Sequence, residues 1–515
     1  GRWGETSGAD AGSIRGETVA VVARWGDAVM RKAGSHVECA RALRAAYRKR
    51  HGEHLSADRI DSIPGLSDEV RARCKAMARE GVTAKELKPR WNLRHKMDPK
   101  VAAEHGMEAV DKMIKDGIWG RVLLMTTAVR RELLDDRDKV MLCKLIRVAK
   151  RNLQGYEIAG EGRFCHAQIE ANELTPSDGV GVGGKVRLPV IKDVLADVSY
   201  FAAMYPGLEI LASKADVSSA FKLLWLAVEL CGLYACAIPQ DVLGLGLGDF
   251  IVIQLTLTFG SSISPGSYDF FSKAIEMGHR AHSPPVPRRD GVSRFRSNTL
   301  VDDGVIVAVK LGASMRFSLA TYLWNMRMAL GPQAVNLEKA REEGMFLARQ
   351  IVWGIGMDLS RAHVNIFDVS LWLTQSKQEK ARGLVFSPLF DWGSFAFGKW
   401  QAQVLAGNVV FWGNVCPPMW AVLLRITAAR RDLPDGKAGP TAAPTTEELA
   451  AYRLTWQAVE LLRVIVGRPE WWKSTVTASF ASVLTLHERL AMRGAEESVV
   501  WCGGDANLHG CAMGS

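Results

Sequence analysis

Two adjacent aspartates, Asp302 and Asp303, lie within an otherwise apolar segment (residues 300–307), and this pair limits the possible folds more than any other feature of the chain. The β-branched residues around them predict two buried strands joined by a tight hairpin. Two like charges in a buried hairpin are costly unless a cation lies between them. Hard carboxylate oxygens favour Mg²⁺ or Mn²⁺, so the pair predicts a divalent-metal site.

A third aspartate, Asp216, lies far upstream in a segment of small and apolar residues (215–221). One carboxylate on a strand and two on a hairpin can hold two metal ions at a phosphoryl-transfer centre. A solvated acidic turn is the alternative interpretation of Asp302 and Asp303 taken alone. The presence of Asp216 and of a Phe259-Gly260 turn favours the metal site.

The composition is that of a basic globular protein. The chain has 515 residues, enough for three or four domain-sized units, and 48% of them are apolar, which is typical of buried cores. Lys and Arg (65) exceed Asp and Glu (55), for a net charge of +10. This excess suits a polyanionic partner, nucleic acid before acidic membrane, although a basic protein without such a partner explains it equally well.

Cysteine usage and hydropathy indicate the compartment. The nine cysteines show no CxxC pair and no zinc-type spacing, which favours free thiols in a reducing environment. The chain has no 18-residue apolar stretch and no signal-peptide pattern, so we expect an intracellular protein, cytoplasmic or nuclear, that is neither secreted nor in a membrane. Because it begins at Gly1, we interpret it as a piece of a longer reading frame.

Hydrophobic periodicity predicts the order of the elements. Helices are expected in the basic N-terminal region and over 98–117, loops over 160–190, and alternating strands and helices over 190–360. The Pro- and Arg-rich segment 282–291 is typical of an exposed connection. Helices dominate after residue 360 and again over 447–493, and a strand-like piece starts at 499.

A glycine-rich stretch (179–185) nearly matches a phosphate-binding P-loop. Val186, however, occupies the position that requires a metal-binding Ser or Thr. No strand is predicted before the stretch and no helix after it. A flexible loop is therefore the better interpretation.

The order of three motifs is more specific than any one of them. A strand ending near Asp216 comes first, a strand over 255–259 then leads through Gly260 into a helix opened by Pro265, and the Asp302-Asp303 hairpin follows. This order resembles the palm of reverse transcriptases, in particular those of retroelements of the long-terminal-repeat and tyrosine-recombinase classes. Further segments resemble the surroundings of that palm, so that the likeness spans about residues 95–515: 113–118, 188–195, 336–339, 352–358, 397–400 and 504–512.

The resemblance implies an α+β fold, namely a right-hand polymerase with fingers, a palm with an antiparallel sheet, and a thumb. A helical N-terminal extension and a helical connection would be added to it. The implied divisions, in chain order, are the N-terminal extension (1–95), fingers and entry to the palm (96–210), palm (211–360), thumb (361–432), linker (433–446), helical connection (447–495) and a truncated ribonuclease H start (496–515).

The resemblance also implies metal-binding and catalytic residues. Asp216 and Asp302 would bind two Mg²⁺ or Mn²⁺ ions, with Asp303 as a supporting carboxylate. Lys339 would protonate the leaving pyrophosphate, unless it is simply a surface lysine in a charged run. Asp505 would be the first metal ligand of the ribonuclease H remnant, whose other carboxylates are not in this sequence.

A second group of residues would contact the incoming nucleotide. Phe221 would collide with a ribose 2′-hydroxyl and so favour deoxynucleotides; a core aromatic is the alternative. Gly260 would let the chain pass close to the base pair. The remaining members of the group are Val217, Phe259, Arg163, and either Lys185 or Arg187.

The implied partners are an RNA or DNA template with its primer and dNTPs, and the sequence does not indicate an oligomeric state. Two other hypotheses stay open: a palm polymerase that copies RNA into RNA, and an inactive retroelement remnant that only binds nucleic acid. Six tryptophans either stack on bases or, more in keeping with their helical spacing, pack in cores. They are Trp392, Trp400, Trp412, Trp420, Trp471 and Trp472.

Overall fold

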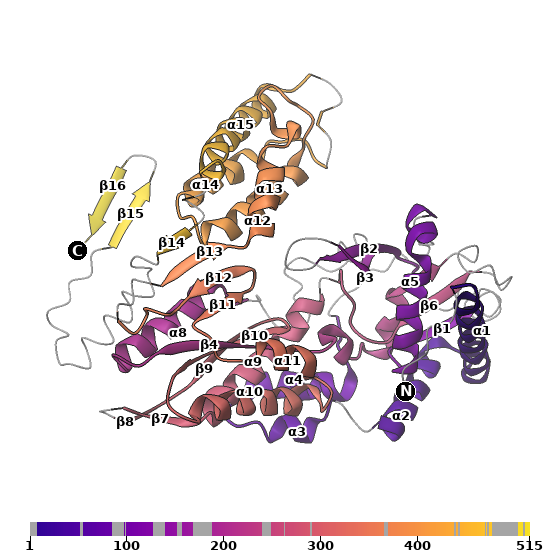
Figure 1. Ribbon diagram of the computed structural model, residues 1–515. Helices are drawn as coiled ribbons and strands as arrows, with labels where there is room; N and C mark the ends of the chain where they lie inside the picture. Colours follow the sequence, from indigo (N-terminus) through magenta and orange to yellow (C-terminus); the bar gives the residue numbers. More distant parts are fainter. Residues whose placement is uncertain are drawn as a thin grey trace.

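The computed structural model is a mixed helical and sheet structure in which every pairing between named strands is antiparallel (Figure 1). This arrangement agrees with the expected α+β class at the level of secondary structure. The described residues are 8–51, 55–84, 97, 99–126, 140–151, 157–167, 188–238, 249–261, 263–288, 291–364, 369–436, 439–440, 443–468, 470, 473–475, 503–507 and 510–514.

The central sheet has the strand order β4 (Ile210–Asp216), β10 (Asp303–Val309) and β9 (Arg296–Leu300). Side chains of β10 alternate between two cores, with Ile306 in one and Val305 and Val307 in the other. Successive residues of a strand point to opposite faces, so a strand buried on both faces becomes a continuous apolar run. This explains why the sequence around the aspartate pair is so apolar.

Helices cover both faces of the central sheet. The helix α8 (Ile191–Met204) shares a core with Val305 and Val307. The helices α9 (Ile263–His282) and α10 (Ser314–Leu330) share the other core with Ile306. Both faces of the sheet are therefore covered by helices, and a site can form at the loops next to Asp216 and Asp303, where the strands end.

A second sheet has the order β1 (Val122–Thr126), β6 (Phe250–Gln254) and β5 (Ala235–Ile238). The helix α5 (Pro99–Ile118) packs against it, close to the predicted span of 98–117. The remaining elements of this region are the hairpin β2 (Lys144–Arg151) and β3 (Glu157–Ala167), and the short helices η1 (Ala220–Leu223) and η2 (Val228–Leu233).

The N-terminal helices belong to the same core as these elements rather than forming a detached arm. They are α1 (Gly8–Ala33), α2 (His36–His51), α3 (Ala57–Asp61) and α4 (Asp68–Glu80). Val82 exchanges backbone hydrogen bonds with Trp225 (2.7 Å) and Ala227 (2.8 Å). Figure 1 shows α3 and α4 lying beside α9 and α10, whereas α1 packs against β1 of the second sheet.

A helical bundle rises above the central sheet (Figure 1). It stands on a sheet of four strands, β11 (Arg349–Val352), β12 (Ile355–Asp358), β13 (Ser370–Leu373) and β14 (Lys473–Thr475). Its members are α12 (Gln375–Val385), η5 (Pro388–Phe390), α13 (Lys399–Gly413), α14 (Met419–Ala429) and α15 (Thr446–Val466). Helix α15 shares one apolar core with α13 and α14.

Four local predictions were wrong. Loops were expected over 160–190, but β3 runs to Ala167 and pairs with β2. The strand before the Phe-Gly turn is β6, which ends at Gln254. Residues 255–258 are buried by packing, with a single isolated β-bridge at Thr256. Segment 282–291 contains the hairpin partners β7 (Pro285–Arg288) and β8 (Gly291–Arg294), because the side chain of Val286 is buried in the core under α8. The helix predicted over 447–493 is not continuous, because α15 ends at Val466 before Gly467 and Pro469, and residues 473–475 form β14.

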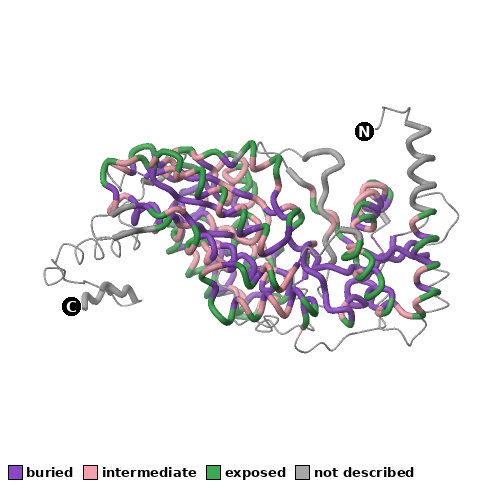
Figure 2. The backbone as a smooth tube through the Cα atoms, turned by 90° about the horizontal axis from the view of Figure 1, so that it is seen from below, coloured by how far each residue is buried: buried purple, intermediate pink, exposed green. Residues whose placement is uncertain are grey.

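Buried segments run continuously through the middle of the elongated body, and exposed segments form its rim (Figure 2). The two helix-covered faces of the central sheet belong to different apolar clusters, one extending to the N-terminal helices and the other into the helical bundle. The aspartate-bearing end of the sheet lies where these two clusters meet.

Candidate active site

The three predicted aspartates come together at one end of the central sheet. Asp303, the first residue of β10, lies directly opposite Asp216, the last residue of β4, in the antiparallel register. Asp302 occupies the turn before β10, and its backbone carbonyl accepts a hydrogen bond from the amide of Val217 (3.0 Å). Directly opposed residues on antiparallel strands have neighbouring side chains, so the register brings two of the carboxylates together.

The backbone around these aspartates is strained. Val301, in the turn between β9 and β10, has φ 57°, a left-handed conformation that is a marked outlier for a β-branched residue. Ser219 (φ 57°) and Trp353 (φ 50°) also lie beside the site, and these are all the non-glycine residues with positive φ in the described ranges. Such conformations persist where the surrounding structure enforces them, often at functional sites.

The helix α11 (Leu337–Glu343) supplies two donors to Asp216. Asn336 caps the helix by accepting from the amide of Lys339 (3.3 Å), and its amide group donates to Asp216 Oδ2 (2.8 Å). Lys339 Nζ lies 2.7 Å from Asp216 Oδ1. Both carboxylate oxygens of Asp216 are therefore held in a defined orientation by one capped helix end.

The pKa of Asp303 is shifted by burial and by the neighbouring carboxylates. Its pKa is raised to about 6, first by desolvation and then by the negative charges of Asp302 and Asp216, while Lys339 opposes the rise. Trp353 donates its indole N–H to the backbone carbonyl of Asp303 (3.1 Å), which fixes the hairpin without neutralising the carboxylate. A cation beside Asp303 would relieve this repulsion.

The carboxylates of this site suit an ion such as Mg²⁺ that takes its remaining ligands from water and substrate. In the described part of the chain, no group of three or more His, Cys, Asp or Glu side chains is arranged to hold a metal ion. Mg²⁺ is commonly bound through one or two carboxylates together with water and substrate phosphates. The opposed pair Asp216 and Asp303, with Asp302 beside it, fits that mode of binding and not a closed protein cage.

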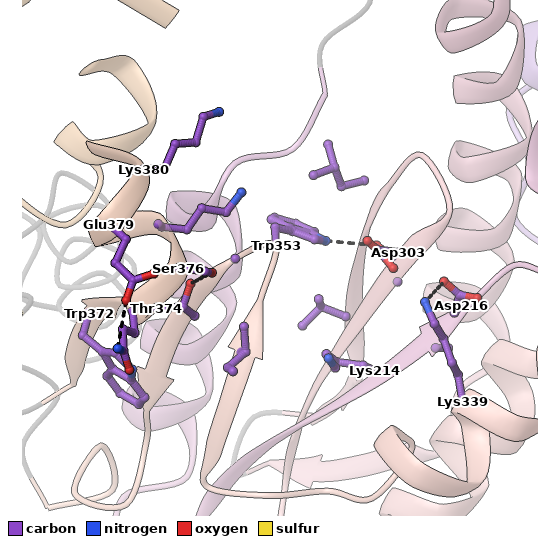
Figure 3. A pocket seen from close by; sticks show the side chains of 18 of the residues that line it. Lys214, Asp216, Asp303, Lys339, Trp353, Trp372, Thr374, Ser376, Glu379 and Lys380 are labelled. Atoms are coloured by element: carbon purple, nitrogen blue, oxygen red, sulfur yellow. Dashed lines mark hydrogen bonds and ion pairs between the residues drawn. The ribbon is translucent and has the colours of Figure 1, made fainter. Parts of the chain in front are cut away.

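Two cavities meet at Asp216 and Lys339. The larger, of about 1370 Å³, is lined by Asp303, Trp353 and side chains of β13 and α12. The smaller, of about 380 Å³, is lined by Asp302, Phe259 and residues 217–220. Figure 3 shows the larger cavity, with Lys339 reaching Asp216 and Trp353 reaching Asp303 on one wall and Lys380 on the other.

The predicted nucleotide contacts fall into two groups. Val217 and Phe259 line the smaller cavity, and Gly260 takes φ 96°, a conformation that L-residues rarely adopt. Phe221 does not line either cavity. Its ring is buried against Phe259 (centroids 5.1 Å apart) and Tyr268 (5.7 Å apart).

Several predicted residues have no described side chain. Arg163 lies in β3 opposite Val148, and Asp505 lies in β15 (Gly503–Asn507), which pairs with β16 (Gly510–Gly514); only their backbones are described. Lys185 and Arg187, and the glycine-rich stretch before them, lie outside the described residues. Among the tryptophans, Trp412 is buried in the bundle, whereas Trp392, Trp400 and Trp420 are exposed; Trp471 and Trp472 lie outside the described residues.

Three residues near the carboxylates received no role from the sequence. Asn336 and Trp353 fall inside segments compared with the palm-closing motifs, so their neighbourhood was indicated but their contacts were not. Tyr322, on α10, hydrogen-bonds the hydroxyl of Thr299 behind the hairpin (2.8 Å). No local pattern marks such a residue, because its position depends on how α10 packs against the sheet.

Comparison with known proteins gives matches at the level of structure. No protein-family model matches the chain, and no curated protein matches its sequence. One similar solved structure is the foamy viral protease-reverse transcriptase dRH in complex with double-stranded DNA (13% identity, 79% of this chain and 59% of that one, TM-score 0.37). Another is the foamy viral protease-reverse transcriptase in complex with double-stranded DNA (12% identity, 78% of this chain and 71% of that one, TM-score 0.39). A third is its complex with an RNA/DNA hybrid (12%, 78% and 45%, 0.39).

Among the described helices, none is both long and apolar enough to cross a membrane.

Proposed function

We propose that the chain is an RNA-directed DNA polymerase that adds dNTPs to a primer on an RNA or DNA template. The observation that carries the proposal is the opposed pair Asp216 and Asp303, with Asp302 beside it, at the junction of two cavities. Phosphoryl transfer needs little covalent chemistry from a protein and depends on charge and position. The site has three neighbouring carboxylates and an adjacent lysine, and a cavity lies on either side of Asp216.

The smaller cavity is assigned to the incoming nucleotide. Its volume of about 380 Å³ lies in the ordinary range for small-molecule sites. Val217 and Phe259 line it, and Asp302 faces it. Divalent ions bound there would activate the primer hydroxyl and neutralise the triphosphate.

The larger cavity is assigned to the primer and template. Its volume of about 1370 Å³ exceeds what one nucleotide needs, and its walls carry Lys214, Lys377 and Lys380. Burial and the neighbouring Lys380 lower the pKa of Lys377. A bound anion would favour the charged form of this lysine. Trp353 and Trp372 add aromatic surface, and basic grooves with aromatic side chains are typical of nucleic-acid tracks.

Lys339 is assigned to the proton that the leaving pyrophosphate needs. Its ammonium group is placed 2.7 Å from Asp216, at the wall shared by the two cavities. A lysine in this position can donate a proton to a phosphate oxygen, regain a proton from water, and then pair with the carboxylate again.

Primer extension tests the proposal. The full chain is given poly(rA)/oligo(dT), dTTP and Mg²⁺, and is compared with Asp303→Asn and Asp216→Asn. Each substitution should lower incorporation by about 100-fold or more, since a metal-binding oxygen is lost. Asp435→Asn, a change in an exposed bundle residue paired with Lys399, should keep full activity.

Two outcomes contradict the proposal. Magnesium-independent primer–template binding without extension by the wild-type chain points to the inactive-remnant hypothesis. Equal use of UTP and dTTP points to an RNA-copying polymerase and removes the role given to Phe221, whose ring lies among core aromatics.

A further inference from the structure

Two lysines on the wall of the smaller cavity share an unusual charge arrangement. Lys112, from α5, and Lys222, from η1, both line this cavity, which Asp302 and Lys339 also line. Neither lysine belongs to the β2–β3 hairpin or to the segment of Lys185 and Arg187, from which triphosphate-binding cations were expected. Their surroundings therefore need a separate explanation.

Each lysine is the second cation on a carboxylate that an arginine already contacts. Glu108 accepts from Arg147 (2.8 Å) and also lies 3.3 Å from Lys112. Asp116, which is buried, lies 3.8 Å from Arg121 and also accepts from Lys222. Among the described ion pairs, each of the two carboxylates therefore has both an arginine and a lysine as partners.

The presence of two cationic partners on each carboxylate has a direct consequence for ligand binding. If either lysine turns towards an anion in the cavity, its carboxylate keeps the arginine, so no buried charge is left without a counter-charge. Exchange of a lysine between a carboxylate and a phosphate then costs little. A lysine that was the sole partner of a buried carboxylate would lack this freedom.

We infer that Lys112 and Lys222 form a polyphosphate-binding wall that holds the triphosphate of the incoming nucleotide opposite the aspartates. The inference rests on the proposed function and adds residues that the sequence comparison did not assign. Lysine is suited to the task as a compact point charge that can follow a phosphate along a flexible stem. Because the two lysines line the same cavity as Asp216 and Asp302, both groups would contact one bound triphosphate.

Steady-state kinetics with saturating primer–template tests the assignment. Lys112→Met and Lys222→Met keep the apolar stem and remove the charge. Each should raise the KM for dTTP about tenfold, the effect of losing one charge-assisted contact, and leave kcat within about twofold. Lys112→Arg and Lys222→Arg should restore most of the KM, and Lys310→Met, in an exposed pair with Glu209 (2.7 Å), should leave it unchanged.

A binding measurement separates this inference from the polymerase proposal. Calorimetric titration of the full chain with inorganic tripolyphosphate should show affinity that falls about tenfold in each Met variant, whether or not the protein extends primers. If the wild type does not extend primers but binds tripolyphosphate through these lysines, the polymerase proposal fails and the wall stands. Unchanged tripolyphosphate affinity and unchanged KM in folded Met variants would overturn the wall.

Discussion

The hydroxyl of Tyr322 lies so close to Gly304 that a β-carbon added to the glycine would be 2.1 Å from the hydroxyl oxygen. Gly304 follows Asp303 in β10, and Tyr322 also hydrogen-bonds Thr299 on β9. One α10 side chain thus contacts both strands of the aspartate hairpin. The lack of a side chain at residue 304 is a packing requirement of the site.

Gly304→Ala should therefore shift the hairpin and reduce primer extension about 100-fold, since displacement of about 1 Å at a reacting centre has effects of that order. Tyr322→Leu, which removes the ring atoms that the new methyl group meets, should restore part of the activity in the double variant. Gly383→Ala is the control, because open space surrounds that helical glycine. Full activity of Gly304→Ala would show that the hairpin adapts freely.

The raised pKa of Asp303, about 6, predicts opposite effects on activity and stability. Its folded-state pKa exceeds the unfolded value, so the folded state is favoured at low pH and loses stability as pH rises from about 4 through 6. Asp303→Asn should abolish extension yet raise the free energy of unfolding at pH 8. The gain should be about 1 kcal/mol or less, because solvent in the cleft screens the repulsion, and it should vanish near pH 4.

Urea denaturation of wild type and Asp303→Asn at pH 4, 6 and 8 measures this difference, and extension assays follow the activity. In the wild type, the apparent Mg²⁺ requirement should rise below pH 6 as Asp303 takes up a proton. A variant that is less stable than wild type at pH 8 would contradict the repulsion described here.

His279 should make the fold sensitive to acid. Its two ring nitrogens hydrogen-bond Ser297 and Ser318 (2.9 Å each), and complete burial lowers its pKa to about 3. The unfolded chain protonates this histidine first, so the stability it contributes is present above about pH 6.5 and is lost as pH falls towards 3. Between pH 6.5 and 4.5 the loss should be on the order of 2 kcal/mol.

Thermal or urea unfolding over this pH range measures the slope. His279→Gln should have a shallower slope, since glutamine does not titrate. His282→Gln, at an exposed position near the end of α9, is the matched control. Identical slopes for wild type and His279→Gln would exclude a neutral, buried imidazole at this position.

Asp27 should anchor α1 to the second sheet. Its carboxylate accepts from the amide (2.7 Å) and the hydroxyl (2.8 Å) of Thr126, and both residues are buried. Asp27→Ala leaves two buried donors unsatisfied, which should cost about 2–3 kcal/mol of unfolding free energy. Asp432→Ala, at an exposed position, is the matched control in urea denaturation. An equal, small effect of both substitutions would show that the Asp27–Thr126 hydrogen bonds do not stabilise the fold.

The aspartate hairpin was predictable because its evidence is local. The period-2 and continuous apolar patterns around Asp302 predict two strands and a turn, and β9 and β10 are those strands. Pro265 likewise indicates the start of α9, where it lies in the first turn. By contrast, residues 255–259 look like a strand, but 255–258 are buried by packing outside any named strand, and a local pattern cannot separate these two cases.

The contacts of the site were beyond such patterns. Asn336 and Lys339 reach Asp216 across more than 100 residues of sequence, and Lys112 and Lys222 share one cavity although they come from different elements. No periodicity carries information about such pairs. They depend on the angle at which one element packs against another.

By itself, the sequence determined the strands, the turn and the placement of two carboxylates side by side on one hairpin, because these follow from alternation and turn chemistry over a few residues. The tertiary structure alone decided that β4 pairs with β10 in the register that sets Asp216 opposite Asp303. It also decided that α5, η1 and α11 face the same aspartates with their lysines. The physical reason is that pairing and packing between distant segments are set by the burial of whole faces, and a charge gains its function only from the charges that this burial places around it.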